Sequence, residues 1–359
     1  MCLHDGVVHH PLGAGSYYFK AALIRYLSDQ CAQSPIAIHI GYQPNCTPHI
    51  GNITTFTTGF AIAAALKADF NRDVRVKFVL VDTAPSPTES TTINGVKYQK
   101  NLNHTGAVKQ NMTPLTEILD RLSSLSTIPY GLETQNIWRS NPAFSTILQK
   151  IISHRHTLGA HLSPETGHLA IRASCPQCGL ADKHGLHNQY HEDGHHITLF
   201  CPNHGNYTVD LTSHEDLNRL EFNTPLRNLL RILLCSADQK QSWIMCTGSD
   251  YAGFYQEQLL WKLLDTPSTA PVIFYAPLIT DWSGGKLSKS LYVEQGAYKY
   301  LDELGRGYLL DGGMFSGIEG GVETLWDEVR GWIGRPYMLF RNYSVEYIDG
   351  RLRSGGMRV

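Results

Sequence analysis

The chain has 359 residues, of which 42% are hydrophobic, and a formal net charge of −2. This length allows a large hydrophobic core and more than one domain. The near-neutral charge excludes a strong bulk attraction to DNA or to anionic membranes. The N-terminal segment lacks the basic and then apolar pattern of a secretory signal, and no apolar stretch is long enough to span a bilayer. We therefore expect a cytoplasmic protein whose eight cysteines stay reduced, with some of them holding metal.

The first third of the chain shows alternating helix and strand patterns. A helix is expected over Tyr17 to Cys31 and a strand over Ile36 to Ile40. A loop rich in Gly and Pro then leads to a helix that opens near Asn52, where apolar residues recur close to helical spacing. Val74 to Val81 is almost continuously apolar, which is typical of a parallel strand covered on both faces. The polar segment Pro85 to Asn111 indicates an insertion or a mobile loop.

The same alternation continues to residue 275. We expect helices over Met112 to Leu125, Asn141 to Leu158 and Thr224 to Leu234, and strands over Trp243 to Cys246 and Val272 to Tyr275. This order predicts an α/β fold with a doubly wound parallel sheet of the Rossmann type. Ligands of such sheets bind outside the carboxyl ends of the strands, where His49, Asp82 and Asp250 would lie.

Two short cysteine motifs predict a zinc ribbon inserted into this sheet. Cys175-Pro-Gln-Cys178 and Cys201-Pro-Asn-His204 are separated by 22 residues and flank a polar hairpin. Three thiolates and one imidazole suit tetrahedral Zn²⁺ in a closed, structural site. Five other histidines near the tip of the ribbon are alternative fourth ligands, namely His184, His187, His191, His195 and His196.

Two distant segments carry residue types that handle phosphates. Gly41 to Asn52 reads GYQPNCTPHIGN, and Lys286 to Ser290 reads KLSKS after two glycines. Each alone would suit an ordinary turn or a solvated surface. Together, in this order, they resemble the HIGH and KMSKS motifs of class I aminoacyl-tRNA synthetases. The resemblance implies an enzyme that activates an amino acid with ATP and Mg²⁺.

The residue types match the chemistry that this resemblance implies. A helix N-terminus offers N–H groups and a positive dipole end to phosphate oxygens, and His49 and Asn52 add donors there. Gly51 leaves room for a nucleotide base, while lysines are mobile point charges for the leaving pyrophosphate. We assign catalysis to His49, Asn52, Lys286 and Lys289, and ATP binding to these four with Pro44, Gly51, Gly248, Asp250 and Ser288.

Asp250 has two compatible interpretations. It follows Gly248 at the end of an expected strand, where its carboxylate would accept hydrogen bonds from ribose hydroxyls. It is equally suited to cap a helix over Gly253 to Leu264.

From Ile36 to Ser290 the chain is similar to class I lysyl-tRNA synthetases. The HIGN form, the metal knuckles between the two halves of the sheet and the segment Ile128 to Ile152 carry this likeness. The chain departs from the family at Thr54 and Thr55, where a basic and an acidic residue are usual and the acidic one helps to hold the substrate's ammonium. The segment after Ser290 is also too short for the family's helical anticodon-binding region.

We therefore predict a class I synthetase-like enzyme that forms an aminoacyl-adenylate and transfers the amino acid to the acceptor end of a tRNA. The alternatives are a truncated paralogue that serves a non-tRNA acceptor, and a non-catalytic binding protein. Lysine is not the expected substrate. The candidate contacts to the amino acid are Gly41, Gln43, Thr55 and Asp82. The expected organisation is a lead-in (1–35), the first half of the catalytic domain (36–170), the zinc ribbon (171–210), the second half (211–295) and a short helical C-terminal segment (296–359).

Overall fold

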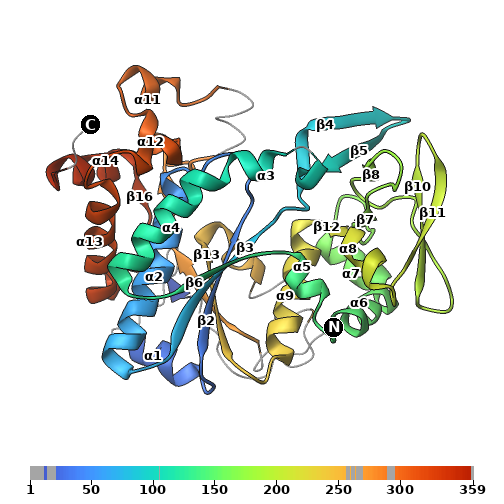
Figure 1. Cartoon of the computed structure of the whole chain (residues 1–359), viewed down its shortest axis with the longest axis horizontal. Helices are drawn as coiled ribbons and strands as arrows, with labels where there is room; N and C mark the ends of the chain where they lie inside the picture. Colours follow the sequence, from blue (N-terminus) through green and yellow to red (C-terminus); the bar gives the residue numbers. More distant parts are fainter. Residues whose placement is uncertain are drawn as a thin grey trace.

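The computed structural model describes residues 12–13, 22–104, 106–255, 259, 263, 270–288 and 296–356. A six-stranded sheet runs through the middle of the molecule (Figure 1). All of its neighbouring strands are parallel. Its order is β1 (Leu12–Gly13), β14 (Val272–Ala276), β13 (Ser242–Gly248), β2 (Ile36–Tyr42), β3 (Val74–Leu80) and β6 (Tyr130–Thr134).

This order confirms the predicted α/β fold and places its switch point. From β2 the chain moves outward through β3 to β6, and it then returns to β13 on the other side of β2. Ile38 is in register with Val76 of β3 and with Ile244 of β13. The order of strands therefore reverses between β2 and β13, which is where open α/β sheets bind their ligands.

Successive residues of β13 and β14 face two different hydrophobic clusters, as the strand period of two requires. Ile244 and Phe274 belong to the cluster beneath α2 (Ile50–Phe70), whereas Met245 and Ile273 belong to the cluster beneath α9 (Thr224–Ala237). The first cluster also holds α1 (Leu23–Gln30), α4 (Met112–Ser126) and α13 (Gly321–Gly334). Both faces of the sheet are thus covered.

The expected helix at Tyr17 to Cys31 corresponds to α1 over the described residues, and Tyr17 to Ala21 lie outside them. The expected strands match β2, β3, β13 and β14 closely. No described helix is both long and apolar enough to cross a membrane.

Of the two alternatives for Pro85 to Asn111, an insertion or a mobile loop, the loop is wrong. This segment forms a hairpin of β4 (Pro85–Ile93) and β5 (Val96–Asn101), followed by the short helices η1 (Leu102–His104) and α3 (Ala107–Gln110). The hairpin turns at Asn94-Gly95, where φ is 51° and 78°. Asn-Gly is the pair that tight hairpin turns prefer, because both central residues need a positive φ.

The single helix expected over Asn141 to Leu158 is divided. The structure has α5 (Asn136–Arg139), α6 (Phe144–Ser153) and α7 (Arg155–Leu162). The ring of His154 lies between α6 and α7, with its Nδ1 2.9 Å from the carbonyl oxygen of Lys150. That carbonyl would accept the backbone N–H of His154 in a continuous helix, so the side chain competes with the helix at this point.

The cysteine motifs lie in a separate lobe beside α9 (Figure 1). Here β7 (Ile171–Ala173) pairs with β12 (Leu220–Phe222), and β8 (Ala181–Asp182) pairs with β5 of the hairpin. A second sheet contains β9 (Gln189–Tyr190), β10 (His196–Cys201) and β11 (Gly205–Asp210), and α8 (His214–Arg219) follows it.

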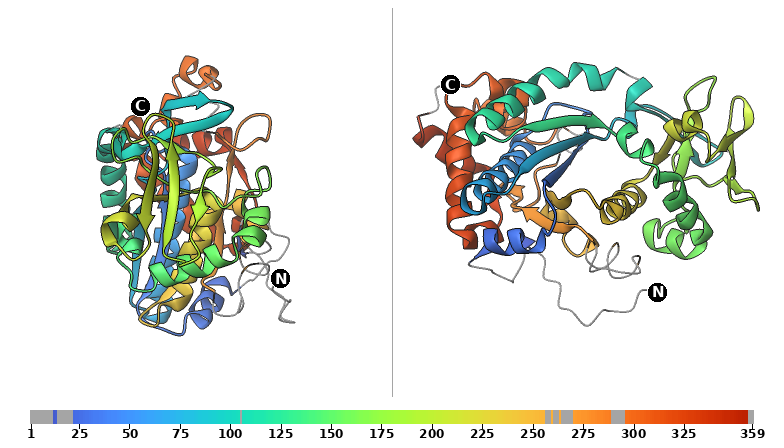
Figure 2. Two further views of the ribbon diagram at one scale, coloured as in Figure 1. Left: turned by 90° about the vertical axis from the view of Figure 1, so that its right-hand side faces the viewer. Right: turned by 60° about the horizontal axis from the view of Figure 1, so that its bottom comes forward.

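The C-terminal segment is helical, as predicted, and it packs into the main core at the opposite end of the molecule from the cysteine lobe (Figure 2). It consists of α11 (Lys299–Glu303), η5 (Gly307–Leu309), α12 (Gly312–Ser316), α13, η6 (Pro336–Phe340), β16 (Tyr343–Ser344) and α14 (Val345–Ser354). Trp332 is fully buried and stacks on Tyr343 with ring centroids 4.3 Å apart. Strand β16 pairs in parallel with β15 (Ile279–Thr280).

Candidate active site

A cavity of about 620 Å³ opens at the carboxyl ends of β2 and β13. It contains most of the residues that the sequence assigned to ATP and the amino acid. The predicted residues that line it are Gly41, Gln43, His49, Gly51, Asn52, Thr55, Gly248, Asp250, Lys286 and Ser288.

His49 is the N-cap of α2, and its side chain is committed to the start of the helix. Its Nδ1 accepts the backbone N–H of Gly51 at 3.0 Å, and Asn52 Oδ1 accepts the backbone N–H of His49 at 3.3 Å. A neutral imidazole that accepts at Nδ1 carries its proton on Nε2. A side chain on residue 51 would place its Cβ only 2.9 Å from His49 Cε1, so this packing requires glycine. The reciprocal caps fix a helix N-terminus at the cavity.

Lys286 and Asp250 form an ion pair at the cavity. Asp250 lies in the short helix η2 (Ser249–Tyr251), directly after β13, and a Cβ on Gly248 would clash with its Oδ1 at 2.4 Å. Both charged side chains are partly exposed, so the pair adds little to stability. The helix expected over Gly253 to Leu264 lies largely outside the described residues, so the capping role of Asp250 stays a prediction.

A tight turn presents Lys286 to the cavity. The carboxylate of Asp281 accepts the backbone N–H groups of Ser283 at 2.9 Å and Gly285 at 3.1 Å, and Gly284 takes a φ of 82°. Leu287 is buried, and its backbone N–H donates to the carbonyl of Ile279 at 2.9 Å. Lys289 and Ser290 lie outside the described residues.

Two predicted residues do not line the cavity. The carbonyl of Pro44 accepts a hydrogen bond from Asn111 Nδ2 at 3.1 Å, which ties the loop before α2 to α4. Asp82 is buried, and it accepts from Asn103 Nδ2 at 3.0 Å and from the backbone N–H of Gln135 at 3.3 Å. Asp82 thus lies at the expected edge of the sheet, but its described hydrogen bonds are made to other residues of the protein.

The remaining walls of the cavity were missed in the sequence. They are Tyr42, Asn45, Phe56, Cys246, Thr247, Tyr251, Leu278, Ile279 and Leu287. Several of these directly precede or follow predicted site residues on the same strand end. Their position at the carboxyl end of an expected strand is the signal in the sequence that could have identified them.

The described lining of the cavity offers no free carboxylate to an ammonium group. Among the described residues that line it, Asp250 is the one acidic side chain, and it is paired with Lys286. Thr55 lines the cavity and donates its hydroxyl to the carbonyl of Gly51 at 3.1 Å. Thr54 is buried and donates to the carbonyl of Ile50 at 2.8 Å.

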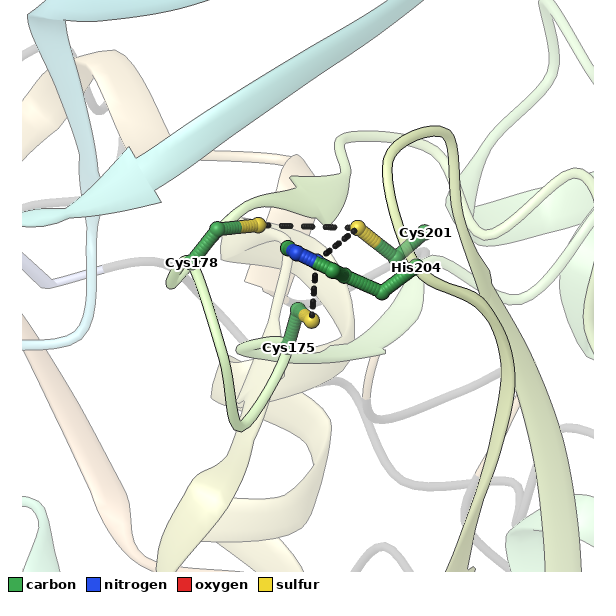
Figure 3. A group of neighbouring side chains, drawn as sticks. All are labelled: Cys175, Cys178, Cys201 and His204. Carbon is green, nitrogen blue, oxygen red and sulfur yellow. Dashed lines mark hydrogen bonds between the residues drawn. The ribbon is translucent and has the colours of Figure 1, made fainter.

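The structure brings Cys175, Cys178, Cys201 and His204 together in the cysteine lobe (Figure 3). Their ligand atoms all lie within 4.8 Å of one another. The sulfurs of Cys178 and Cys201 are 3.5 Å apart, and His204 Nδ1 lies 3.5 Å from Cys175 and 3.6 Å from Cys201. A zinc tetrahedron has S–S and S–N edges of roughly 3.8 and 3.6 Å, so the donor set and its spacing fit Zn²⁺.

The surroundings of Cys175 in the first knuckle also favour its deprotonated thiolate form. Burial raises the pKa of the Cys175 thiol, but N–H groups of the knuckle and hydrogen bonds to Cys201 and His204 outweigh this effect and bring the pKa to about 7. A thiolate is the form that binds metal. His204 thus occupies the predicted fourth position, while His187 and His196 are engaged by Asp182 and Asp193.

No family model matches the chain. Over 149 residues it is 26% identical to a lysine–tRNA ligase of Halobacterium salinarum. The aligned segment covers 40% of this chain and 27% of that protein. The chain thus spans about a quarter of the length of this curated relative.

Solved structures that align with part of the chain include two glutamate–tRNA ligases. One, from Elizabethkingia meningosepticum, was solved with its amino acid, and it is 12% identical with a TM-score of 0.34 over 73% of this chain and 53% of that chain. The other, from Elizabethkingia anophelis, is 11% identical with a TM-score of 0.31 over 73% and 54% of the two chains. The chain is therefore class I aminoacyl-tRNA synthetase-like, on the sequence similarity together with its HIGN and KLSKS segments and its parallel sheet.

Proposed function

We propose that the protein activates an amino acid with ATP and Mg²⁺ to form an aminoacyl-adenylate. A carboxylate oxygen of the amino acid attacks the α-phosphorus, the bond to the bridging oxygen breaks, and pyrophosphate leaves with the electron pair. The attacking carboxylate is already ionised, so the reaction needs no general base. Positioning and electrostatic stabilisation then supply the rate enhancement.

One observation carries this proposal: a single cavity joins the capped N-terminus of α2 with Gly248, Asp250 and Lys286. The helix N-terminus and the Nε2–H of His49 would donate to phosphate oxygens. Asp250 would accept from the ribose, and Lys286 would move from it to the leaving phosphates. From the sequence motif, Lys289 would join Lys286 in that role.

We also propose that Cys175, Cys178, Cys201 and His204 hold one structural Zn²⁺. Four protein ligands close the site and leave no position for a reactive water. The metal would join the two knuckles, which precede and follow the β9–β10 hairpin.

The second half of the proposed reaction is transfer of the amino acid to the acceptor end of a tRNA. A second cavity of about 370 Å³ shares Gln43 with the first, and Lys183 and Arg227 are among its lining residues. Basic side chains next to the proposed site of the adenylate suit the phosphates of an RNA end. Charging of total tRNA, after the amino acid is known, tests this step.

The test of the proposed function is ATP–pyrophosphate exchange with each of the twenty standard amino acids. Exchange that depends on one or a few amino acids and on Mg²⁺ is the expected result. Lysine is not expected among them, because the one described carboxylate in the cavity is paired. Absence of exchange with every amino acid contradicts the proposal and favours a non-catalytic binding protein.

A further inference from the structure

Arg231 is a buried guanidinium on α9 with unused donors. Its Nη2 donates to Asn228 Oδ1 at 2.6 Å and to the hydroxyl of Tyr255 at 2.5 Å, and its Cζ lies 5.7 Å from the centre of a Trp138 ring. Its Nε is sealed from solvent without an acceptor, and Nη1 has no acceptor among the described residues. Buried polar groups are nearly always hydrogen-bonded, so a largely buried guanidinium with two unused nitrogens needs an explanation.

No described carboxylate forms an ion pair with Arg231. Its neighbour one turn earlier, Arg227, is a second buried cation, bonded to the carbonyl of Phe222 and to the hydroxyl of Thr224. Another buried arginine of the chain does have a counter-ion, since Arg172 Nε lies 3.0 Å from Glu221 Oε2. A buried cation without a counter-ion is costly, and like charges four residues apart on a helix add to the cost.

Arg231 does not itself line the cavity, but its free Nη1 lies directly behind Gly41, at the proposed amino-acid end. Gly41 lines that cavity, and a Cβ on Gly41 would lie 3.1 Å from Arg231 Nη1 and 3.7 Å from His39 Cε1. Unlike Nε, Nη1 is not sealed from solvent. Because residue 41 has no side chain, a ligand atom over it is within reach of Nη1.

The described residues around Gly41 supply no unpaired carboxylate that would compete for this arginine. Burial, and next the charge of Arg231, hold the pKa of His39 well below its usual value, so the imidazole is neutral at physiological pH. Gln43 and Thr55, which line the same end of the cavity, are uncharged. Asp250 is already paired with Lys286.

We infer that the amino acid activated at this site carries a side-chain carboxylate, which Arg231 receives beside Gly41. This inference rests on the proposed function and names its substrate class. Nη1 would donate to the carboxylate, and the ion pair would neutralise the buried charge. Charge-assisted hydrogen bonds of this kind are the strong ones, and a site built around one rejects a ligand that leaves it unpaired.

The first test is ATP–pyrophosphate exchange with aspartate and glutamate beside asparagine and glutamine. The expected result is that one acid supports exchange well and its amide poorly. Arg231→Gln should then lower kcat/KM for the acid by about 30-fold or more and remove the preference over the amide. Arg231→Lys should restore part of that preference. Arg121→Gln is the matched control: Arg121 pairs with Glu323 between α4 and α13, so the acid-to-amide ratio should not change.

A second variant keeps the inference testable if Arg231→Gln fails to fold. Gly41→Ala retains the charge but places a methyl group between Nη1 and the ligand. Calorimetric titration with the acidic aminoacyl-sulfamoyl adenosine and with its amide counterpart should show that this variant loses affinity for the acidic analogue selectively.

The outcomes separate the two proposals. Exchange with a neutral or cationic amino acid, but with neither acid, overturns this inference and leaves the proposed function standing. An unchanged acid-to-amide ratio in folded Arg231→Gln also overturns it. Absence of exchange with every amino acid overturns the proposed function and this inference together.

Discussion

The cavity at the sheet and the Cys175–His204 cluster are built in opposite ways. The cluster takes its four candidate ligands from two short turns within 30 residues of sequence, and they are held so close together that a bound ion would have no open position. The cavity collects residues from Gly41 to Ser288, and its walls are open to a ligand. One region therefore suits a permanent structural role, and the other suits molecules that enter and leave.

This contrast predicts that the two regions can be damaged separately, and the largest effect should come from the cluster. Cys178→Ser removes one of four ligands, so the purified protein should lose most of its zinc and the cysteine lobe should become protease-sensitive. Metal analysis by mass spectrometry and limited proteolysis measure this. Cys235→Ser is the control, because Cys235 lies on α9 outside the cluster. A Cys178→Ser protein with full metal content would refute the assignment.

The next largest effect should come from Lys289. Lys289→Ala should slow amino-acid activation by about a hundredfold, or about 3 kcal/mol, because a preorganised charge acts mainly when pyrophosphate leaves. Pyrophosphate exchange at saturating ATP measures the rate, and the KM for ATP should change much less. Lys240→Ala, before β13 at the opposite edge of the sheet, is the control. Equal rates for the parent and Lys289→Ala would show that the KLSKS segment has no catalytic part.

His49 should show a similar loss of rate with a separate loss of stability. His49→Ala removes both the imidazole and the N-cap of α2, so it should slow exchange about a hundredfold and cost about 1 kcal/mol of unfolding free energy. His49→Asn keeps a capping side chain, so it should recover the stability but not the rate. Urea unfolding beside pyrophosphate exchange distinguishes the two losses. If His49→Asn recovers the rate as well, the histidine is only a cap.

The smallest effect should come from the hairpin that connects the two regions. Gly95 has a φ of 78°, and β5 of this hairpin pairs with β8 next to the first knuckle. Gly95→Ala should therefore cost about 1 kcal/mol of stability, because alanine is strained at positive φ. Its zinc content and exchange rate should stay unchanged. Urea unfolding measures the loss, with Gly334→Ala in α13 as a control where a Cβ meets nothing within 4 Å. Equal destabilisation by both changes would deny any special role to the turn.

The parts of the molecule that depend on local sequence were the predictable ones. Apolar runs and helical spacing located β2, β3 and α2, and the CPxC and CPxH knuckles located the cluster. The β4–β5 hairpin also has a local turn signal in the sequence, the Asn94-Gly95 pair, which lies within a segment of mostly polar residues.

Arg231 had no such signal. Its significance depends on Gly41, which lies 190 positions away and meets it only because β2 and α9 pack together in the fold. For the same reason the sequence predicts a separate C-terminal segment, although Trp332 and Leu352 of that segment are buried in the main core. Tertiary packing decides such contacts, and the spacing of residues along the chain does not record it.

The pairing of β2 with β13 has a consequence for the order in which the protein folds during synthesis. Ile36 to His39 are in register with Ser242 to Met245, so more than two hundred residues must leave the ribosome before β2 gains its second neighbour. The cysteine lobe lies wholly within that interval, and strands β9, β10 and β11 of the lobe pair at short sequence separation, which favours fast formation. We therefore expect the lobe to acquire structure on the nascent chain before β2 pairs with β13.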